Sequence, residues 1–313
     1  MCEIKSPADF NTMLELVSYF KDEKTCLDYI ELWRWKGDIK CDECGRFKIY
    51  RFKNGKRFKC AHCAHYFTIT SGTIFDNTKL PLTKWMMAIY YIANHKKGYS
   101  SCELAREIGV SQKTAWHLLH KLRKAMHMED VKLEGVVSSD ESFVGGKNKN
   151  RHKDKKSKYA IGRNFEDKVP VLGMMEHGGN VKTIVLPSVA GKHIREGVFN
   201  TLKRGSILVT DEYHAYHRMN RYYHHEVVEH HRGQYTNASG FSSNNIEGFW
   251  SHLKRMILGV YHFISRKHLQ KYCDELTFRF NNRKEKQSTR FAMLFDRLRH
   301  KITYKQIVYE QAA

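Results

Sequence analysis

Gly135-Val-Val-Ser-Ser-Asp140 and Ser206-Ile-Leu-Val-Thr-Asp211 are the two stretches that best indicate the architecture of the larger part of this chain. Each is a short apolar run that ends in an aspartate, with a glutamate directly after it. Runs of this length that are rich in β-branched residues predict strands rather than helices. We therefore predict two strands of one domain that each end in a carboxylate.

The residues around these stretches complete an α/β pattern. Further strands are expected at 169–175, 181–186 and 226–229, with a hairpin turn at Gly178-Gly-Asn and helices over 193–202 and 244–258. The predicted order is a three-stranded meander, a helix, two more strands and a helix. This order is the pattern of a ribonuclease-H-like α/β domain.

Three acidic side chains converge in this pattern, namely Asp140, Asp211 and, in the first turn of the last helix, Glu247. Clustered carboxylates repel one another unless a divalent cation lies among them, and Mg²⁺ prefers oxygen ligands. Two such ions can activate a water and stabilise the leaving oxygen of a phosphodiester. Lys254 follows Glu247 by seven residues, so it lies on the same helix face and could approach a phosphate.

Each of these residues also has a purely structural interpretation. Asp140 could cap a turn and Asp211 could cap a helix, and the glutamate that follows each aspartate is its rival as a ligand. Asn244 and Glu247 have the spacing of a capping box, and Lys254 could simply be solvated.

A basic segment separates the first two predicted strands. Residues 147–158 contain seven lysines and arginines and one acid, which predicts a DNA-contacting loop through Lys147, Lys149 and Arg151. A solvated loop would have the same composition. The histidine-rich stretch 224–232 lacks the spacing of a second zinc site, and we expect His231 to orient phosphate there.

Residues 101–122 predict two helices joined by a sharp turn. Leu104, Ala105 and Ile108 form an apolar stripe, Gly109 permits the turn, and Ser111 is a good N-cap. This is the pattern of a helix-turn-helix, whose second helix enters the major groove, although a hairpin without DNA contacts is the alternative. The side chains expected to face DNA are Gln112, Lys113, Thr114 and His117. A supporting helix is expected over 82–97.

Four cysteines near the start, Cys41, Cys44, Cys60 and Cys63, read C-x2-C-x15-C-x2-C. Four thiolates give Zn²⁺ a closed tetrahedral shell with no open position, so this zinc is expected to be structural. Basic and apolar residues alternate between the two pairs, which predicts the strands of a zinc ribbon. Two short helices predicted within 9–36 would pack against it.

The composition indicates a polyanionic partner. Lysine and arginine number 54 against 33 acids among 313 residues, a net charge of +21, and nucleic acid is the simplest such partner. No apolar run approaches the roughly 20 residues of a membrane span. The remaining cysteines stand alone and no secretory signal opens the chain, so a reducing compartment, the cytoplasm, is expected.

Three motifs make the chain recognisable: Asp140-Glu-Ser-Phe-Val-Gly-Gly-Lys147, Thr210-Asp-Glu-Tyr-His-Ala-Tyr216 and Asn245-Ile-Glu-Gly-Phe-Trp-Ser-His-Leu-Lys-Arg255. Together they resemble the zinc-ribbon DDE transposases of bacterial insertion sequences, which are related to the Merlin transposons. Segments 259–272 and 278–283 look like the C-terminal signature of the same group. The resemblance covers residues 20–290.

The resemblance implies that Asp140, Asp211 and Glu247 form a triad that holds Mg²⁺ or Mn²⁺, followed by Lys254. The 36-residue step from Asp211 to Glu247 fits that family. An asparagine at 244–245 is the alternative third ligand, and we prefer Glu247 because it supplies charge as well as an oxygen.

The function implied is DNA transposition in the bacterial cytoplasm, in association with the nucleoid. The protein would bind the terminal inverted repeats, cleave the ends by Mg²⁺-dependent hydrolysis and join the 3′-hydroxyls to target DNA, as a homodimer or larger assembly. A zinc-dependent transcriptional regulator and a nuclease without strand transfer are the alternatives. The expected parts are an N-terminal helical segment (1–38), the zinc ribbon (39–72), the helix-turn-helix region (80–128), the catalytic domain (132–285) and a C-terminal helical tail (286–313).

Overall fold

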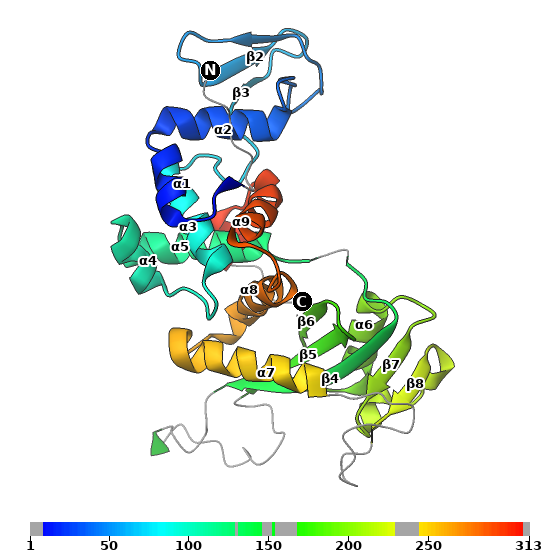
Figure 1. Ribbon diagram of the computed structural model, residues 1–313. Coiled ribbons are helices and arrows are strands. Elements are labelled where there is room, and N and C mark those ends of the chain that lie inside the picture. The colour runs from blue at the N-terminus through cyan, green and yellow to red at the C-terminus, as the bar shows by residue number, and fades with distance from the viewer. Residues whose placement is uncertain (1–8, 129–130, 146–151, 154–167, 229–243, 309–313) are drawn as a thin grey trace. The chain divides into compact units, whose positions relative to one another are not determined.

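The computed structural model describes residues 9–128, 131–145, 152–153, 168–228 and 244–308, and the chain forms two compact units (Figure 1). The first unit contains residues 1–95, 99–125 and 284–310, and the second contains residues 96–98, 126–283 and 311–313. The C-terminal helices therefore pack with the N-terminal ones, a return of the chain that no local sequence pattern indicates.

The first unit combines a small antiparallel sheet with helices. The sheet has the order β1-β2-β3 and is formed by β1 (Ile49–Arg51), β2 (Arg57–Cys60) and β3 (Tyr66–Thr68). The helices are α1 (Met13–Tyr19), α2 (Glu23–Trp35), α3 (Leu82–Asn94), α4 (Ser101–Ile108), α5 (Gln112–Ala125), α9 (Gln287–Asp296) and α10 (Tyr304–Val308). The two helices predicted within 9–36 and the helix predicted over 82–97 are confirmed.

Aromatic rings hold the C-terminal helix α9 in the core of this unit. The ring of Phe291 meets Phe10 edge-on at 5.9 Å between centroids, and Phe295 meets Tyr29 at 5.4 Å. Such pairs contribute about 0.5–1.5 kcal/mol each beyond the burial of their area. Long-range contacts of this kind explain why residues 284–310 belong to the first unit.

The second unit is built on one mixed sheet. Its strands are β4 (Val136–Gly145), β5 (Lys168–Glu176), β6 (Val181–Val185), β7 (Ile207–Thr210) and β8 (His224–Val227), in the order β6-β5-β4-β7-β8. β4, β5 and β6 form an antiparallel meander, while β7 runs parallel to β4 and β8 runs parallel to β7. The predicted order of a meander, a helix and two further strands is confirmed.

Helices cover both faces of this sheet (Figure 1). One face packs against α6 (Gly191–Thr201) through Leu172, Ile194 and Val198. The other face packs against α7 (Asn244–Met256) and α8 (Leu269–Asn281), and α7 buries the apolar stripe predicted from the sequence. That stripe was predicted as Ile246, Phe249, Trp250, Leu253 and Ile257. The first four are buried, Ile257 lies just beyond the end of α7 and is only partly buried, and Met256 is buried as well. No helix in the described part of the chain is both long and apolar enough to span a membrane.

Two strand boundaries differ from the prediction. β4 does not end at Asp140 but continues to Gly145, because it stays paired with the long β5 from Asp140↔Gly173 to Gly145↔Lys168. The interpretation of Asp140 as a turn cap is therefore wrong. β8 begins at His224 instead of at residue 226, because its histidines extend the pairing with β7 on an edge strand.

Candidate functional site

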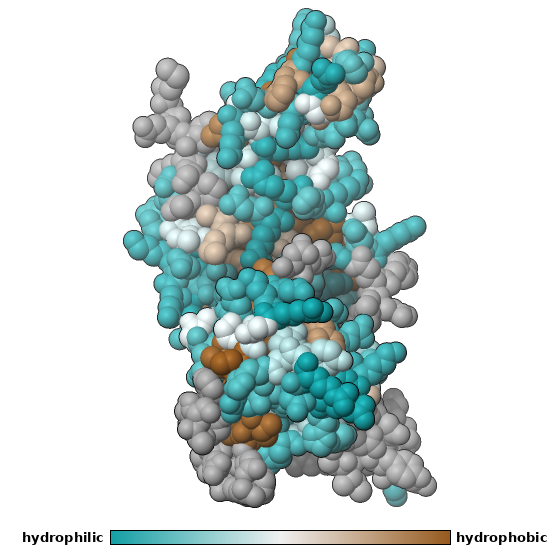
Figure 2. All heavy atoms as spheres, turned by 90° about the vertical axis from the view of Figure 1, so that its right-hand side faces the viewer, coloured by the Kyte–Doolittle hydropathy of each residue, from teal (hydrophilic) through white to brown (hydrophobic). Residues whose placement is uncertain are grey.

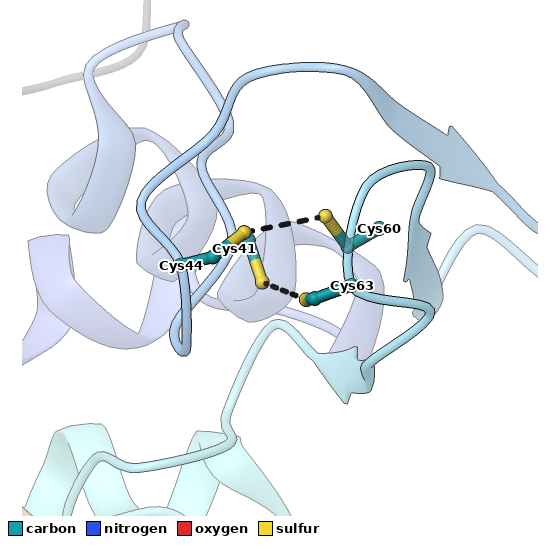
Figure 3. A group of neighbouring side chains, drawn as sticks. All are labelled: Cys41, Cys44, Cys60 and Cys63. Carbon is teal, nitrogen blue, oxygen red and sulfur yellow. Dashed lines mark hydrogen bonds between the residues drawn. The ribbon is translucent and has the colours of Figure 1, made fainter.

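The four cysteines of the ribbon form a compact cluster (Figure 3). The sulfur of Cys41 lies 3.6 Å from that of Cys63, Cys44 and Cys60 are separated by the same distance, and all four sulfurs lie within 4.8 Å of one another. Four sulfurs bound about 2.3 Å from one zinc ion would be about 3.8 Å apart in a tetrahedron. The cluster therefore fits a Zn²⁺ ion held entirely by thiolates.

The local backbone shapes this cluster. Gly45 adopts φ +68°, and its N–H donates to the carbonyl of Cys41 at 3.0 Å, which closes the first turn. In the second turn the backbone amides of Cys63 and His62 donate to the sulfur of Cys60, and they lower the pKa of that thiol to about 6. A thiol that is already stabilised as thiolate suits a zinc ligand.

Helices α4 and α5 meet at the turn predicted from the sequence. Gly109 ends α4 in the left-handed conformation at φ +61°, and Lys84 on α3 donates to its carbonyl at 2.8 Å. The Ser111 hydroxyl accepts the backbone N–H of Thr114 at 3.2 Å, as expected of an N-cap. Hydrogen bonds thus hold the turn on both sides, at the end of α4 and at the start of α5.

The four side chains predicted to face DNA lie on the first two turns of α5 but differ in their surroundings. Gln112, Lys113 and Thr114 are exposed, although Gln112 also donates to the Ser101 hydroxyl at 2.7 Å. The ring of His117 is half-buried and stacks on Tyr304 of α10, with 5.6 Å between ring centroids. Lys113 is therefore the long, exposed cation at this end of α5.

The strand register brings Asp140 and Asp211 to the same level of the sheet. Ser138 of β4 pairs with Val209 of β7 in parallel, and each aspartate lies two residues beyond its member of that pair. Side chains alternate along a strand, and Asp140 lies on the face that α7 covers. Asp211 lies one residue beyond β7, and its carboxylate is near enough to contribute to the raised pKa of Asp140. The backbone N–H of Tyr213 donates to Asp211 Oδ1 at 3.1 Å and orients that carboxylate.

Helix α7 supplies a direct partner for Asp140. The indole N–H of Trp250 donates to Asp140 Oδ2 at 2.9 Å. Gly173, the cross-strand neighbour of Asp140, leaves room for this ring, because a Cβ there would lie 2.5 Å from the indole. Glu247 lies one turn before Trp250 on the same helix and is exposed. The sequence identified Trp250 only as an apolar residue of the α7 stripe, and its polar role depends on the tertiary contact.

The three acids share one electrostatic environment. The pKa of Asp140 is raised to about 6, chiefly by burial and to a smaller extent by the negative charges of Asp211 and Glu247. Hydrogen bonds from the backbone amide of Glu141 and from the indole of Trp250 oppose the rise. Within the described part of the chain, only the cysteine cluster has its ligand atoms within 4.8 Å, so the three carboxylates are neighbours and not a closed shell. Such a site favours a cation that would compensate the charge of Asp140.

Glu141 faces the opposite side of the sheet from Asp140. It pairs across the strands with Leu172 of the α6-side core, and the Tyr216 hydroxyl donates a short hydrogen bond to its carboxylate. The Tyr216 hydroxyl also lies 3.0 Å from that of Ser139. This placement separates Glu141 from Asp211 and Glu247.

Other predicted residues are placed only in part. Lys254 and Asn245 are exposed on α7, and Lys254 lies about 10 Å along the helix from Glu247. Lys147, Lys149, Arg151 and His231 lie outside the described residues.

Gly173→Ala is expected to destabilise the second unit by about 1–3 kcal/mol, because its methyl group would overlap the buried ring of Trp250. Chemical denaturation of the full chain measures the change. Gly248→Ala is the matched control: Gly248 lies within α7 with nothing within 4 Å of its added Cβ, so it should stabilise the protein by about 0.5–1 kcal/mol. Equal stability of both variants would contradict the close packing of Trp250 on β5.

The first unit contains a four-cysteine ribbon, and the second contains a mixed sheet with three acids near β4. Together these features define a class of zinc-ribbon proteins with an acidic candidate site. Residues 132–281 match the ISXO2-like transposase domain family, and residues 21–66 match the transposase zinc-ribbon domain family. The chain is thus related to the zinc-ribbon DDE insertion-sequence transposases, as its motifs predicted.

Single proteins that resemble this chain are identical to it at only a minority of positions. A Halobacterium salinarum protein, described as an uncharacterized protein in transposable element ISH50, is 26% identical over 269 residues, which cover 82% of this chain and 90% of that protein. The chain is also similar to two solved structures: the Mos1 strand transfer complex, at 14% sequence identity, and a pre-cleavage Mos1 transpososome, at 10% sequence identity. They cover 68% and 67% of this chain and 74% of each of those chains, at TM-scores of 0.28 and 0.27.

Proposed function

We propose that this protein is a DNA transposase that excises and inserts an insertion sequence. It binds the terminal inverted repeats, hydrolyses the phosphodiester at each element end with water as the nucleophile, and leaves a 3′-hydroxyl. That hydroxyl then attacks a phosphodiester of the target DNA, so that one bond forms as another breaks. The transposase domain at 132–281 supports this reaction class.

The proposal is carried by the approach of three acids from separate elements. The register Ser138↔Val209 places Asp140 and Asp211 at one level of the sheet, and Trp250, one turn after Glu247, donates to Asp140. A sheet of order β6-β5-β4-β7-β8 with an antiparallel meander and two parallel strands supports a ribonuclease-H-like fold for the second unit. In that arrangement the end of β7, the middle of β4 and the first turn of α7 each contribute one acid.

The acidic site has the donors that a divalent cation needs. Carboxylate oxygens are the ligands that Mg²⁺ and Mn²⁺ prefer, and a cation would stabilise the buried carboxylate of Asp140, whose pKa is raised chiefly by burial. Asp140, Asp211 and Glu247 would hold the metal, which supplies activation of water and stabilisation of the leaving oxygen. Trp250 orients Asp140, the Tyr213 amide orients Asp211, and exposed Lys254 is available to a phosphate oxygen.

DNA binding is assigned to the first unit. The geometry of α4 and α5, joined at Gly109, supports a helix-turn-helix with α5 in the major groove. The net charge of +21 supports contacts with phosphates, and the zinc ribbon extends the surface that recognises the element end. Joining two ends in one complex calls for at least two copies of the chain.

The test uses the zinc-loaded full-length protein with labelled DNA carrying the element ends, with and without Mg²⁺. We expect binding under both conditions, and Mg²⁺-dependent nicking followed by joining to a target plasmid. Binding without metal-dependent chemistry would instead indicate a transcriptional regulator. Cleavage without joined product would indicate a nuclease of the same fold, and either result would overturn the proposal.

Lys113→Ala is expected to weaken binding to the element ends most strongly at low salt, because Lys113 is exposed at the start of α5. Loss of one phosphate contact should reduce the slope of log K against log salt by about 1. Titrations by fluorescence anisotropy over a range of salt concentrations measure this slope. Lys24→Ala, which removes an exposed lysine of α2, should leave it unchanged, and identical slopes for both variants would exclude Lys113 as a contact.

A further inference from the structure

The outer face of the ribbon sheet carries a row of aromatic and basic side chains. Tyr50 pairs with Lys59, and Lys59 pairs with Tyr66, so these three side chains lie side by side across β1, β2 and β3. Phe52 and Arg57 follow beside them, where the backbone N–H of Phe52 donates to the carbonyl of Arg57 at 3.0 Å. We call these five residues the ribbon face.

The two faces of this sheet differ in their exposure to solvent, because α2 covers the face opposite the ribbon face. Phe58 and Phe67 are buried and pack edge-on against Trp35 of α2, at 5.6 Å and 6.1 Å between ring centroids. On the ribbon face, by contrast, Tyr50 is 57% exposed, Tyr66 is 51% exposed and Phe52 is 41% exposed. Hydrophobic surface beside hydrophilic side chains is visible over the zinc ribbon in Figure 2. The core of the ribbon therefore does not require these exposed rings.

Cations accompany the rings of the ribbon face. The Lys59 ammonium lies 5.2 Å from the centre of the Tyr66 ring, and the Arg57 guanidinium lies 5.9 Å from the centre of the Phe52 ring. Residues 46–59 contain seven lysines and arginines and no acid. A polyanion whose backbone meets these cations would bring its own planar groups against the rings.

We infer that the ribbon face binds unpaired DNA bases by stacking them on two platforms: the ring of Tyr50, and the adjoining rings of Phe52 and Tyr66, whose centroids lie 6.0 Å apart. Tyr50 and Tyr66 lie on strands separated by one further strand, and thus about 10 Å apart. That spacing suits single bases splayed from a strand, and not the continuous stack of a duplex, which presents only base edges and backbone to a protein. Arg57 and Lys59 then neutralise the adjoining phosphates.

The assignment to DNA, as opposed to RNA, rests on the proposed function, since opening or cleavage at an element end would supply unpaired DNA. Stacking is tolerant of base identity because every base has an aromatic face. The ribbon face would therefore recognise the unpaired state of the element end, while α5 reads its duplex sequence.

The experiment measures binding of the zinc-loaded full-length protein to a labelled single-stranded DNA oligonucleotide, the same sequence as a blunt duplex, and the matching RNA. Tyr50→Ala and Tyr66→Ala should each weaken single-strand binding by about 5-fold to 100-fold, as expected for loss of one stacked base. Tyr50→Phe and Tyr66→Phe keep the rings and should bind as the parent does. A fluorescent base analogue in the oligonucleotide should be quenched by the parent and not by the alanine variants.

Tyr222→Ala is the matched control, because Tyr222 is equally exposed but lies in the second unit. Unchanged single-strand binding by the ribbon variants, an equal loss for the blunt duplex, tighter binding of RNA, or loss of zinc from the alanine variants would each overturn the inference. A change in the oligomeric state of those variants would instead assign the ribbon face to contact between copies of the chain, and would overturn it too.

The outcome is separable from that of the proposed function. A protein that fails to cleave element ends, yet needs Tyr50 and Tyr66 for single-stranded DNA, would refute the transposase reaction and leave this inference standing. If the protein with both tyrosines replaced by alanine cleaves and joins normally and binds single strands equally well, this inference is refuted and the transposase reaction stands.

Discussion

Asp140→Asn and Asp211→Asn should each reduce Mg²⁺-dependent cleavage of element ends by about 1000-fold or more, while end binding is retained. Loss of a ligand from a site that polarises a phosphodiester removes several kcal/mol of transition-state stabilisation, and each 1.36 kcal/mol is a factor of ten in rate. Glu247→Gln should behave in the same way. Single-turnover cleavage and anisotropy on the same DNA separate chemistry from binding.

The asparagine variant of Asp140 should also fold at least as stably as the parent at neutral pH without divalent ions. The pKa of Asp140 is raised in the folded state, so its favourable contribution is complete below pH 3.8 and is lost as the pH rises through about 6. Asparagine removes that unfavourable charge and keeps an oxygen for the indole N–H of Trp250. A loss of activity would therefore not be due to unfolding.

Glu134→Gln is the control for these variants, because Glu134 is an exposed acid of the second unit that pairs with Lys203 at 2.5 Å. It should retain full activity. If Glu247→Gln remained active while Glu141→Gln or Asn245→Ala did not, the assignment of the third ligand would be wrong. The position of Glu141 on the α6 side of the sheet argues against the first of these outcomes.

Removal of zinc is expected to have an equally large effect, confined to the ribbon. Structural zinc contributes about 10–16 kcal/mol to the folding of small zinc modules. The ribbon has strands of only three or four residues and a small core around Phe58 and Phe67, so it has little else to hold it. Cys60→Ser or a strong chelator should abolish end binding first and leave the sheet of the second unit folded.

Hydrogen exchange resolved by segment, together with zinc content, measures this difference between the two units. Cys102→Ser is the matched control, since Cys102 is exposed on α4 and outside the cluster. Normal end binding by zinc-free protein would contradict the role given to the ribbon. Simultaneous loss of protection in β4 and β5 would contradict the independence of the second unit.

Local sequence patterns were enough to predict the features that depend only on residues close together in the chain. The spacing of Cys41, Cys44, Cys60 and Cys63 predicted their cluster, because each C-x2-C turn brings its own two sulfurs together. Gly109 predicted the turn between α4 and α5, since its left-handed backbone has a steric cause within the residue itself. Apolar periodicity likewise predicted the buried stripe of α7.

Features that depend on distant partners could not be predicted in this way. The extension of β4 beyond Asp140 is due to its pairing with β5, more than twenty residues later in the chain. In the sequence, the aromatic residues of the ribbon face appear only as residues that alternate with lysines and arginines. Which face of the sheet stays exposed depends on the packing of α2 against the opposite face.

Spacing and periodicity, which are properties of short segments, were enough to predict the zinc ligands, the three candidate acids and the order of helices and strands from β4 to α7, although they did not predict α8. Three other features became evident from tertiary contacts alone: Asp140 and Glu141 face opposite sides of the sheet, Trp250 donates to Asp140, and residues 284–310 return to the first unit. These features depend on which apolar surfaces are buried against each other, and those surfaces belong to segments that are far apart in the chain.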